Sequence, residues 1–538
     1  MRGAAGIVLI LSAGMAATAN QAPGMPPQKV LTDEQNARTC QLLEPDATAE
    51  QRSVACTVLI NGDLYSGEGL AAIYLYRGIA REDLERLAEA ERDYSRALEI
   101  FPSDDGYRRR AMVRCRIGDN AGSDADFTYF LSRNPSDSTG LFGRGLCYNM
   151  QKKYEDASRV LDKALAVDPI DKGSYYERGI AKYERRDYGG AIADFTHALA
   201  PKDGAVYAAR SFAYIKAGQN DRALADINTA IGLHPTAMRY RTRGLIYGLL
   251  KRYPEALADF DAALALKPSG RDAARTHYAR GAALRKMNRS AEADAEYDAA
   301  IAADSTWGVP YVGRANLDIA RHDFGAADAD LDKAVSLTPD DSYAWHNRGF
   351  LRWLEGRYAE AVSDLTRSIA VEPKPLAYYN RGQAYLSLGR YGEAMADFAA
   401  AAKLEPLSAK DVAAICRTKL AMGLPLSDVR ASCEVALDPK LTEKSADVYV
   451  DRAAIDLREG KAADAIEDAN AAIAMKDPLH VEPNLAFRGY LTTADSLYLR
   501  GLGELRLGRT AEGTTDIAAA KVEKPKIADD YAKLGVTN

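Results

Sequence analysis

The 538-residue sequence has few of the residues that usually carry chemistry, with six histidines, six cysteines and three tryptophans. No histidine is paired with another histidine or with a cysteine at helical spacing. The sequence also lacks the motifs of zinc proteases, phosphate-binding loops and serine hydrolases. We therefore expect no catalytic residue, no metal site and no cofactor.

An excess of positive charge is also missing, because 70 Lys and Arg stand against 76 Asp and Glu, for a net charge of −6. A protein that binds nucleic acid by neutralising phosphates usually has a basic excess or a basic stripe, so we expect no nucleic-acid partner. The 41 glycines and 21 prolines are too few for a fibrous chain. The 47% of hydrophobic residues is ample for a buried core.

Long hydrophobic runs are absent after the first residues. A positively charged start, apolar residues 6–11, and the small residues Ala17 and Ala19 are typical of a secretory signal peptide. A membrane anchor is the alternative, but it needs about 20 apolar residues. The pattern predicts a signal peptide at residues 1–19, a linker at residues 20–28, and an exported protein, periplasmic or secreted, with no transmembrane segment.

What the sequence does contain is one phrase that recurs every 32–37 residues from Arg77 to Arg381. It reads Tyr-x-x-Arg-Gly, with a Gly eight residues after the Arg, an Ala thirteen after it and a Pro near twenty-five. We call this Arg the anchor. The anchors are Arg77, Arg110, Arg144, Arg178, Arg210, Arg243, Arg280, Arg314, Arg348, Arg381, Arg452 and Arg500. With a degenerate copy around Cys416, about thirteen units lie between residues 66 and 525.

Each unit is predicted to be a pair of helices. In residues 205–235, apolar side chains recur at spacings of three and four on two segments separated by Gly218. Pro235 ends the second segment, because proline lacks an amide hydrogen and clashes with the preceding turn. One helix pair cannot bury both of its apolar faces, so the copies must stack on one another.

An acidic residue stands sixteen positions after nearly every anchor. These residues are Asp93, Asp126, Asp194, Asp226, Asp259, Glu296, Asp330, Asp364, Asp397, Asp468 and Asp516, whereas the copy at Arg144 has Val160. We interpret the pattern as a repeated Arg–carboxylate pair that links the two helices and fixes their register. The alternative is a ladder of cationic sites for an anionic ligand, but repetition in every copy favours the structural role.

Residues 378–385 and 389–394 resemble the consensus of the tetratricopeptide repeat family, and the similarity extends over roughly residues 66–525. The family's usual Leu before the anchor Gly is Arg in this chain. The resemblance implies an all-α fold, a right-handed superhelical solenoid of stacked helix-turn-helix repeats, whose first helices line a concave groove that holds proteins or peptides. We expect a helical cap at residues 29–65 and a C-terminal capping helix at residues 526–538.

Residues two before, two after and five after each anchor are expected to project into that groove. The candidates for binding a protein are Phe142, Tyr176, Ile180, Tyr183, Phe212, Tyr278, His346, Phe350, Trp353, Tyr379 and Gln383. Aromatic residues often anchor interfaces. The alternative for any one of them is a place in the core between adjacent copies. The Lys and Asn clamp of the family's chaperone-binding members is missing, which disfavours that class of partner.

Six cysteines in an exported chain point to disulfides, and six allow fifteen connectivities. Cys40 and Cys56 are sixteen residues apart and Cys416 and Cys433 seventeen, the separation of one helical hairpin. The second pair stands where the degenerate copy lacks its anchor and acid, so a covalent link there is expected to replace the ion pair. Cys115 and Cys147, on neighbouring first helices, are either bridged or free. Buried free thiols remain the alternative for all six.

We therefore expect a non-enzymatic, exported scaffold whose groove holds a protein or peptide segment. One alternative is an accessory subunit or ligand-handling component of an envelope enzyme complex, or a hydrolase whose site forms only in the fold. Self-association is also open, because the ends of a solenoid can stack. An extra segment near residues 477–491 is expected to loop out of the array. The sequence does not identify the partner.

Overall fold

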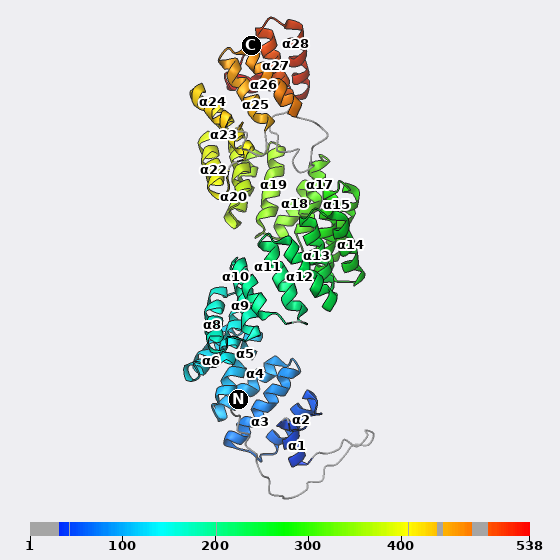
Figure 1. Ribbon diagram of the computed structural model, residues 1–538, viewed down its shortest axis with the longest axis vertical. Helices are drawn as coiled ribbons and strands as arrows, with labels where there is room; N and C mark the ends of the chain where they lie inside the picture. Colours follow the sequence, from blue (N-terminus) through cyan, green and yellow to red (C-terminus); the bar gives the residue numbers. More distant parts are fainter. Residues whose placement is uncertain are drawn as a thin grey trace. The chain divides into compact units, whose positions relative to one another are not determined.

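The computed structural model of the chain describes residues 32–41, 43–200, 202–406, 408–437, 445–475 and 493–537. In these ranges the regular structure consists of 29 helices without a strand, which is the expected all-α class (Figure 1). The signal peptide and linker expected at residues 1–19 and 20–28 lie outside the described residues, as does the loop expected near residues 477–491.

The chain divides into two compact units, Met1–Leu250 and Lys251–Asn538. The described helices of the first unit are α1 (Asp33–Cys40), α2 (Ala49–Asn61), α3 (Gly67–Asp83), α4 (Leu87–Ile100), α5 (Asp104–Arg116), α6 (Asn120–Arg133), α7 (Ser138–Met150), α8 (Tyr154–Val167), α9 (Lys172–Glu184), α10 (Tyr188–Ala198), α11 (Gly204–Lys216), α12 (Asn220–Leu233) and α13 (Ala237–Leu249).

The described helices of the second unit are α14 (Tyr253–Ala265), α15 (Gly270–Lys286), α16 (Ser290–Ala303), α17 (Val309–Ala320), α18 (Phe324–Leu337), α19 (Ser342–Leu354), α20 (Tyr358–Val371), α21 (Pro375–Ser387), α22 (Tyr391–Leu404), α23 (Ala409–Ala421), α24 (Leu426–Val435), α25 (Ala446–Arg458), α26 (Ala462–Met475), α27 (Thr493–Arg506), α28 (Thr510–Glu523) and α29 (Ile527–Lys533). In both units the odd-numbered helices from α3 to α27 are the first helices of the repeats.

Helices pack in sequence order within each unit. In the first unit the pairs run from α3/α4 to α11/α12, and in the second from α15/α16 to α27/α28 (Figure 1). The helices α1 and α2 pack together ahead of α3, and α29 follows the last pair. Each unit is therefore a solenoid of stacked helix pairs.

The turn inside each pair explains the glycine eight residues after the anchor. In all twelve copies with an anchor, that residue has a positive φ, between 58° and 85°. The residues are Glu85, Gly118, Lys152, Arg186, Gly218, Lys251, Asn288, His322, Gly356, Gly389, Gly460 and Gly508. Glycine adopts this conformation without the Cβ clash that other residues meet. Glycine is therefore favoured at this position of the repeat.

The small residue after the anchor lets the two helices approach closely. A Cβ added to Gly382 would lie 2.6 Å from the ring of Phe398, and one added to Gly501 would lie 2.8 Å from the carbonyl oxygen of Gly513. In eleven of the twelve copies with an anchor, the residue seventeen positions after the anchor fills this contact and is at most 2% exposed. These side chains are Tyr94, Phe127, Leu161, Phe195, Ile227, Phe260, Tyr297, Leu331, Leu365, Phe398 and Ala469.

First helices of neighbouring repeats also contact one another, and they form one side of each unit. We call this side the first-helix wall; it is built by α5, α7, α9 and α11 in the first unit and by α15 to α27, odd numbers only, in the second. No helix in the described ranges is both long and apolar enough to cross a membrane.

Candidate functional site

In nine repeats the anchor Arg is held by the acid sixteen residues later through two parallel hydrogen bonds. The Nε and Nη2 atoms of Arg348, for example, donate to the two carboxylate oxygens of Asp364, each at 2.8 Å. The same forked contact occurs at Arg77, Arg110, Arg178, Arg210, Arg314, Arg381, Arg452 and Arg500, with distances of 2.5 to 3.0 Å. This geometry gives Arg–carboxylate pairs both strength and directional specificity.

The anchor also reaches the second helix of the preceding repeat, eighteen residues after that repeat's own anchor. Arg178, Arg314 and Arg348 donate from Nη1 to Asp162, Asp298 and Asp332 at 2.6 to 2.7 Å. In other copies a Ser, Thr or Asn accepts instead, as at Arg110, Arg210, Arg243, Arg381 and Arg500. Each of these anchors except Arg243 therefore joins three helices and two repeats.

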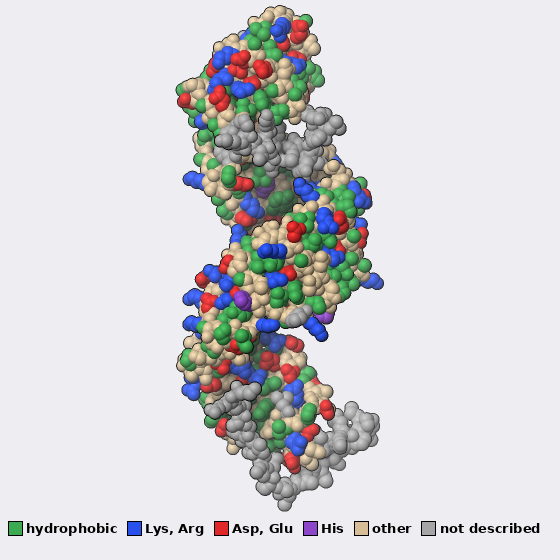
Figure 2. Space-filling view, in the orientation of Figure 1, with side chains coloured by type: hydrophobic (Ala, Val, Ile, Leu, Met, Phe, Trp, Pro, Cys, Tyr) green, Lys and Arg blue, Asp and Glu red, His purple; other side chains and the backbone are tan. Residues whose placement is uncertain are grey.

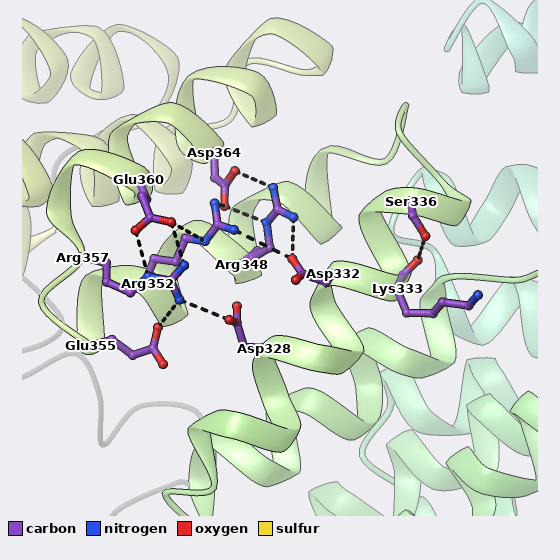
Figure 3. A network of polar contacts seen from close by, with 10 residues as sticks. All are labelled: Asp328, Asp332, Lys333, Ser336, Arg348, Arg352, Glu355, Arg357, Glu360 and Asp364. Atoms are coloured by element: carbon purple, nitrogen blue, oxygen red, sulfur yellow. Dashed lines mark hydrogen bonds and ion pairs between the residues drawn. The ribbon is translucent and has the colours of Figure 1, made fainter.

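Figure 3 shows this arrangement at α19, where Arg348 lies between Asp364 of α20 and Asp332 of α18. A second cation, Arg352, donates to the same Asp364 at 2.8 Å. Burial by itself lowers the pKa of the Arg348 guanidinium. Asp364 and Asp332 raise this pKa by a larger amount, so its net shift is upward. The anchor stays charged and saturated with acceptors, so it offers no vacant site to an anionic ligand.

Sequence reasoning missed three parts of this network. One is the acceptor on the preceding repeat. The second is the extra cation four residues after the anchor, present as Arg81, Arg114, Lys182 and Arg352. The third is the contact between the guanidinium and the aromatic ring three residues before the anchor, the Tyr of the recurring phrase in most copies; the ring covers the guanidinium at 4.8 to 5.9 Å in nine copies. Aligning the copies at their period shows which residue types recur at these positions, but the contact with the preceding repeat depends on how the repeats pack.

The copy at Arg144 keeps its anchor although Val160 replaces the acid. Arg144 turns to the preceding repeat and donates to Asp124 at 2.7 Å and to Thr128 at 3.1 Å. The hydroxyl of Tyr148 also donates to Asp124. The loss of one carboxylate is therefore offset by a neighbour, and the guanidinium remains paired.

The candidates for protein binding in the second unit gather on α19 and α21. The rings of Phe350 and Trp353 stack at 6.2 Å, and the indole of Trp353 donates to Ser387 Oγ at 3.3 Å. The side chain of His346 lies 2.8 Å from Asn380 Nδ2. Figure 2 shows the surface hollowed beside α19, with hydrophobic side chains in the hollow. These groups join adjacent first helices and are half-buried.

Two candidates in the second unit are almost fully enclosed. Tyr379 is 7% exposed and packs on Phe398 at 5.7 Å, and Gln383 is 5% exposed. Tyr278 is half-buried between Tyr297 and Trp307. Tyr379 thus belongs largely to the core of its own repeat, which is the alternative that the sequence left open.

The candidates in the first unit are half-buried on α7, α9 and α11. Tyr176 packs on Phe195 at 5.7 Å and Tyr183 on Tyr188 at 5.6 Å, while Ile180 covers the same core. Phe142 lies against Gly173 of the next first helix, and Phe212 is half-buried on α11. The structure therefore brings these residues together along the wall, each partly in contact with core residues.

The six cysteines form three pairs at disulfide distance, with Cα–Cα separations of 4.9 Å for Cys40–Cys56, 5.8 Å for Cys115–Cys147 and 5.3 Å for Cys416–Cys433. The first pair joins α1 to α2, and the third joins α23 to α24 of the degenerate copy. The pair that the sequence left open, Cys115–Cys147, joins the first helices α5 and α7.

Polar side chains from four helices, three of them carrying charged groups, converge at the C-terminal end of the second unit. Asp451 of α25 lies 3.7 Å from Arg417 of α23 and is 2% exposed. Asp495 of α27, 3% exposed, accepts hydrogen bonds from Tyr531 of α29 and from Lys524. Burial raises the pKa of Asp451 to about 7; Arg417 opposes this, while Asp447 and Asp495 add to it.

This cluster predicts that acid stabilises the C-terminal end. An Asp whose folded pKa lies above its unfolded pKa contributes stability that is complete below the unfolded pKa and is lost as the pH rises through the folded pKa. Between pH 4 and pH 8, the amides of α25 and α29 should therefore lose hydrogen-exchange protection relative to Asp451→Asn, after correction for intrinsic rates. If hydrogen-exchange protection of these helices changes with pH in the same way in the wild type and in Asp451→Asn, Asp451 is not the cause of the pH dependence.

The described residues include no group of three or more His, Cys, Asp or Glu placed to hold a metal ion. On the face seen in Figure 2, cationic and anionic side chains are interspersed without a field of one sign. The anchor arginines of the wall that form the forked pair are held by their acids, as described above. The half-buried aromatic side chains of the wall are thus the feature best suited to contact another molecule.

Comparison with known proteins agrees with this geometry. The helix pairs and their period define the chain as a helical-repeat protein. The model of the tetratricopeptide repeat matches residues 151–206, 212–271 and 351–409, so these three segments are similar to that repeat.

Curated relatives match over part of their length only. The chain is 27% identical over 164 residues to tetratricopeptide repeat protein 6 of Homo sapiens, covering 29% of this chain and 31% of that protein. It is 28% identical over 121 residues to the Hsp70-Hsp90 organizing protein of Triticum aestivum, covering 22% and 21%. The chain thus spans less than a third of the length of these two relatives.

Solved structures show similarity as well. A tetratricopeptide repeat protein from Parabacteroides merdae is 22% identical with a TM-score of 0.37, over 44% of this chain and 93% of that one. The APC/C hetero-tetramer Cut9–Hcn1 is 14% identical with a TM-score of 0.46, over 89% and 98%.

Proposed function

We propose that the protein is a non-enzymatic scaffold that binds protein or peptide segments on the first-helix wall. The observation that carries the proposal is the group of half-buried aromatic residues on α19, where Phe350 and Trp353 stack side by side and Tyr343 is 44% exposed. Rigid aromatic side chains with a polar edge supply much of the energy at protein interfaces. No reactive constellation accompanies them among the described residues.

The family supports this class of function. Tetratricopeptide-repeat proteins hold protein partners, and one relative is named for organizing Hsp70 and Hsp90. The Lys and Asn clamp of chaperone-binding members is missing from this sequence, so the proposal does not extend to chaperones. The partner is a protein segment with apolar side chains that can pack on the aromatic rings.

We also propose that the protein acts outside the cytoplasm. The signal-peptide pattern of residues 1–19 supports this. The placement of all six cysteines in pairs at disulfide distance supports it too, because disulfides persist in oxidising compartments. Expression of the full chain with a reporter in the source cell, followed by fractionation, tests the location; recovery in the cytoplasm with free thiols would contradict it.

The binding proposal is tested by replacing Phe350 and Trp353 with Ala in the full chain. Affinity capture from the protein's own compartment, followed by mass spectrometry, identifies the partner, and the purified pair gives the affinity. Truncating an interface aromatic of this kind costs about 2 kcal/mol or more, so we expect binding at least about 30-fold weaker with unchanged helical content.

The matched controls are Leu266→Ala and Leu404→Ala. These side chains are 49% and 51% exposed and lie at the C-terminal ends of the second helices α14 and α22, away from the wall. They should leave capture unchanged. Equal capture by the Phe350/Trp353 variant and by these controls would place the interface on another surface.

A further inference from the structure

Four sulfur atoms meet on the first-helix wall of the first unit. Cys115 and Met112 come from α5, and Cys147 and Met150 come from α7. Cys115 Sγ lies 3.7 Å from Met150 Sδ, and Cys147 Sγ lies 4.0 Å from Met112 Sδ. The two cysteines are themselves at disulfide distance. Each cysteine sulfur of the pair is therefore in contact with a methionine sulfur of the neighbouring first helix.

These distances fit a tetrahedral metal site. Ligand sulfurs at about 2.3 Å from a central ion lie about 3.8 Å apart along the edges of the tetrahedron. The two Cys–Met separations already have about this length, and the cysteine pair, which lies at disulfide distance, has to open. We propose that Met112, Cys115, Cys147 and Met150 form a binding site for a soft monovalent cation, Cu(I), when the Cys115–Cys147 disulfide is reduced.

The chemistry of the donors selects the ion. Thiolate and thioether sulfurs are soft ligands that favour Cu(I), whereas hard divalent cations prefer carboxylate and carbonyl oxygens. No imidazole or carboxylate is needed, which agrees with the absence of His, Asp and Glu clusters in the described ranges.

Formation of the site couples metal binding to redox state. A dithiol breaks the Cys115–Cys147 bond, transfers two electrons and two protons to the cysteines and leaves as its own cyclic disulfide. One Cu(I) then binds the two sulfurs as thiolates and releases the two protons. Oxidation of the cysteines restores the disulfide and removes both thiolate ligands.

The position of the cluster gives the ion a route to it. Cys115 and Cys147 are 4% and 1% exposed, but Met150 is 52% exposed on α7. Unlike this pair, the other two cysteine pairs have carbonyl oxygens beside them: Cys56 Sγ lies 3.8 Å from Cys40 O, and Cys416 Sγ lies 3.7 Å from Val429 O. They serve as internal references for thiols without this thioether pair.

The test uses the full chain, reduced with a dithiol and freed from it by anaerobic gel filtration. Cu(I) is titrated against bicinchoninate, and X-ray absorption gives the coordination of the bound copper. We expect Met112→Leu with Met150→Leu to weaken one equivalent at least tenfold and to lower its sulfur coordination from four towards two. Cys115→Ser with Cys147→Ser should remove that equivalent altogether.

Leucine conserves the volume of methionine, so the double variant should fold, and Met150→Leu alone, at an exposed position, should give a smaller loss in the same direction. The control is Met238→Leu with Met422→Leu, whose side chains are 48% and 43% exposed elsewhere. This control should bind copper as wild type does. Wild-type affinity in the Met112/Met150 variant, or two-sulfur coordination of every bound ion in the wild type, would overturn the proposal.

Discussion

Replacing Asp364 with Asn should destabilise the repeats around α19 and α20 by about 3–5 kcal/mol, the cost of removing one partner from a buried ion pair. Asp364 is 3% exposed and accepts from both Arg348 and Arg352. Asparagine has nearly the same shape, but it removes the negative charge and turns two hydrogen-bond donors towards the guanidinium groups. Two cations would remain partly buried beside a neutral amide (Figure 3).

Native-state hydrogen exchange is the suitable measurement, because long repeat arrays need not unfold in one step. Protection of the α19 and α20 amides should fall by at least about 10²-fold, which corresponds to the lower end of the energy given above. The matched control is Glu393→Gln, which breaks the Arg390–Glu393 pair at 2.8 Å, where both side chains are about half exposed. Exposed pairs contribute about 0–1 kcal/mol, so equal effects of the two changes would contradict the structural role of the anchor pair.

Replacing both Cys416 and Cys433 with Ala should destabilise the degenerate repeat by about 3 kcal/mol, the amount estimated for closing a loop of about this length. This repeat has no anchor Arg at the usual place and no acid opposite it. Its two helices are joined by the cysteine pair and by the hydrogen bond from Lys419 Nζ to Ser432 Oγ at 2.7 Å. The covalent bond therefore carries the role that the ion pair has elsewhere.

The loss should be confined to α23 and α24 and should appear as faster hydrogen exchange in those helices. Reduction of the wild-type chain provides the control for lost side-chain volume, since it removes the bond and keeps both sulfurs. If reduced wild type exchanges as slowly as oxidised wild type in α23 and α24, the bond is not what stabilises this repeat. The Cys40–Cys56 pair in α1 and α2 should open independently of it.

Much of the fold follows from residues at fixed separations. The pairing of each anchor with the acid sixteen residues later follows from two helices joined by a turn of constant length. The confirmed all-α solenoid rests on the same period. Gly218 and Pro235 mark the turn and the end of one unit correctly, because each acts on the backbone within a few residues of itself.

Spacing along the sequence predicted less about which candidate residues are free to bind a partner. Positions relative to the anchor place Phe350 and Trp353 on the wall, but they do not separate them from Tyr379, which is buried against Phe398. The difference depends on the size of the neighbouring side chains in three dimensions. For the same reason the sequence left Cys115 and Cys147 open, since their pairing requires two first helices to lie close together.

The sequence by itself determined the contacts inside a repeat: the helix pair, its left-handed turn and the anchor–acid pair, all fixed by short separations and helical periodicity. Only the tertiary structure decided the contacts between repeats. These include the third partner of each anchor, the four sulfurs around Cys115 and Cys147, and the convergence of Arg417, Asp451, Asp495 and Tyr531. Their geometry depends on the angle at which one helix pair packs on the next, and no spacing within a single copy specifies that angle.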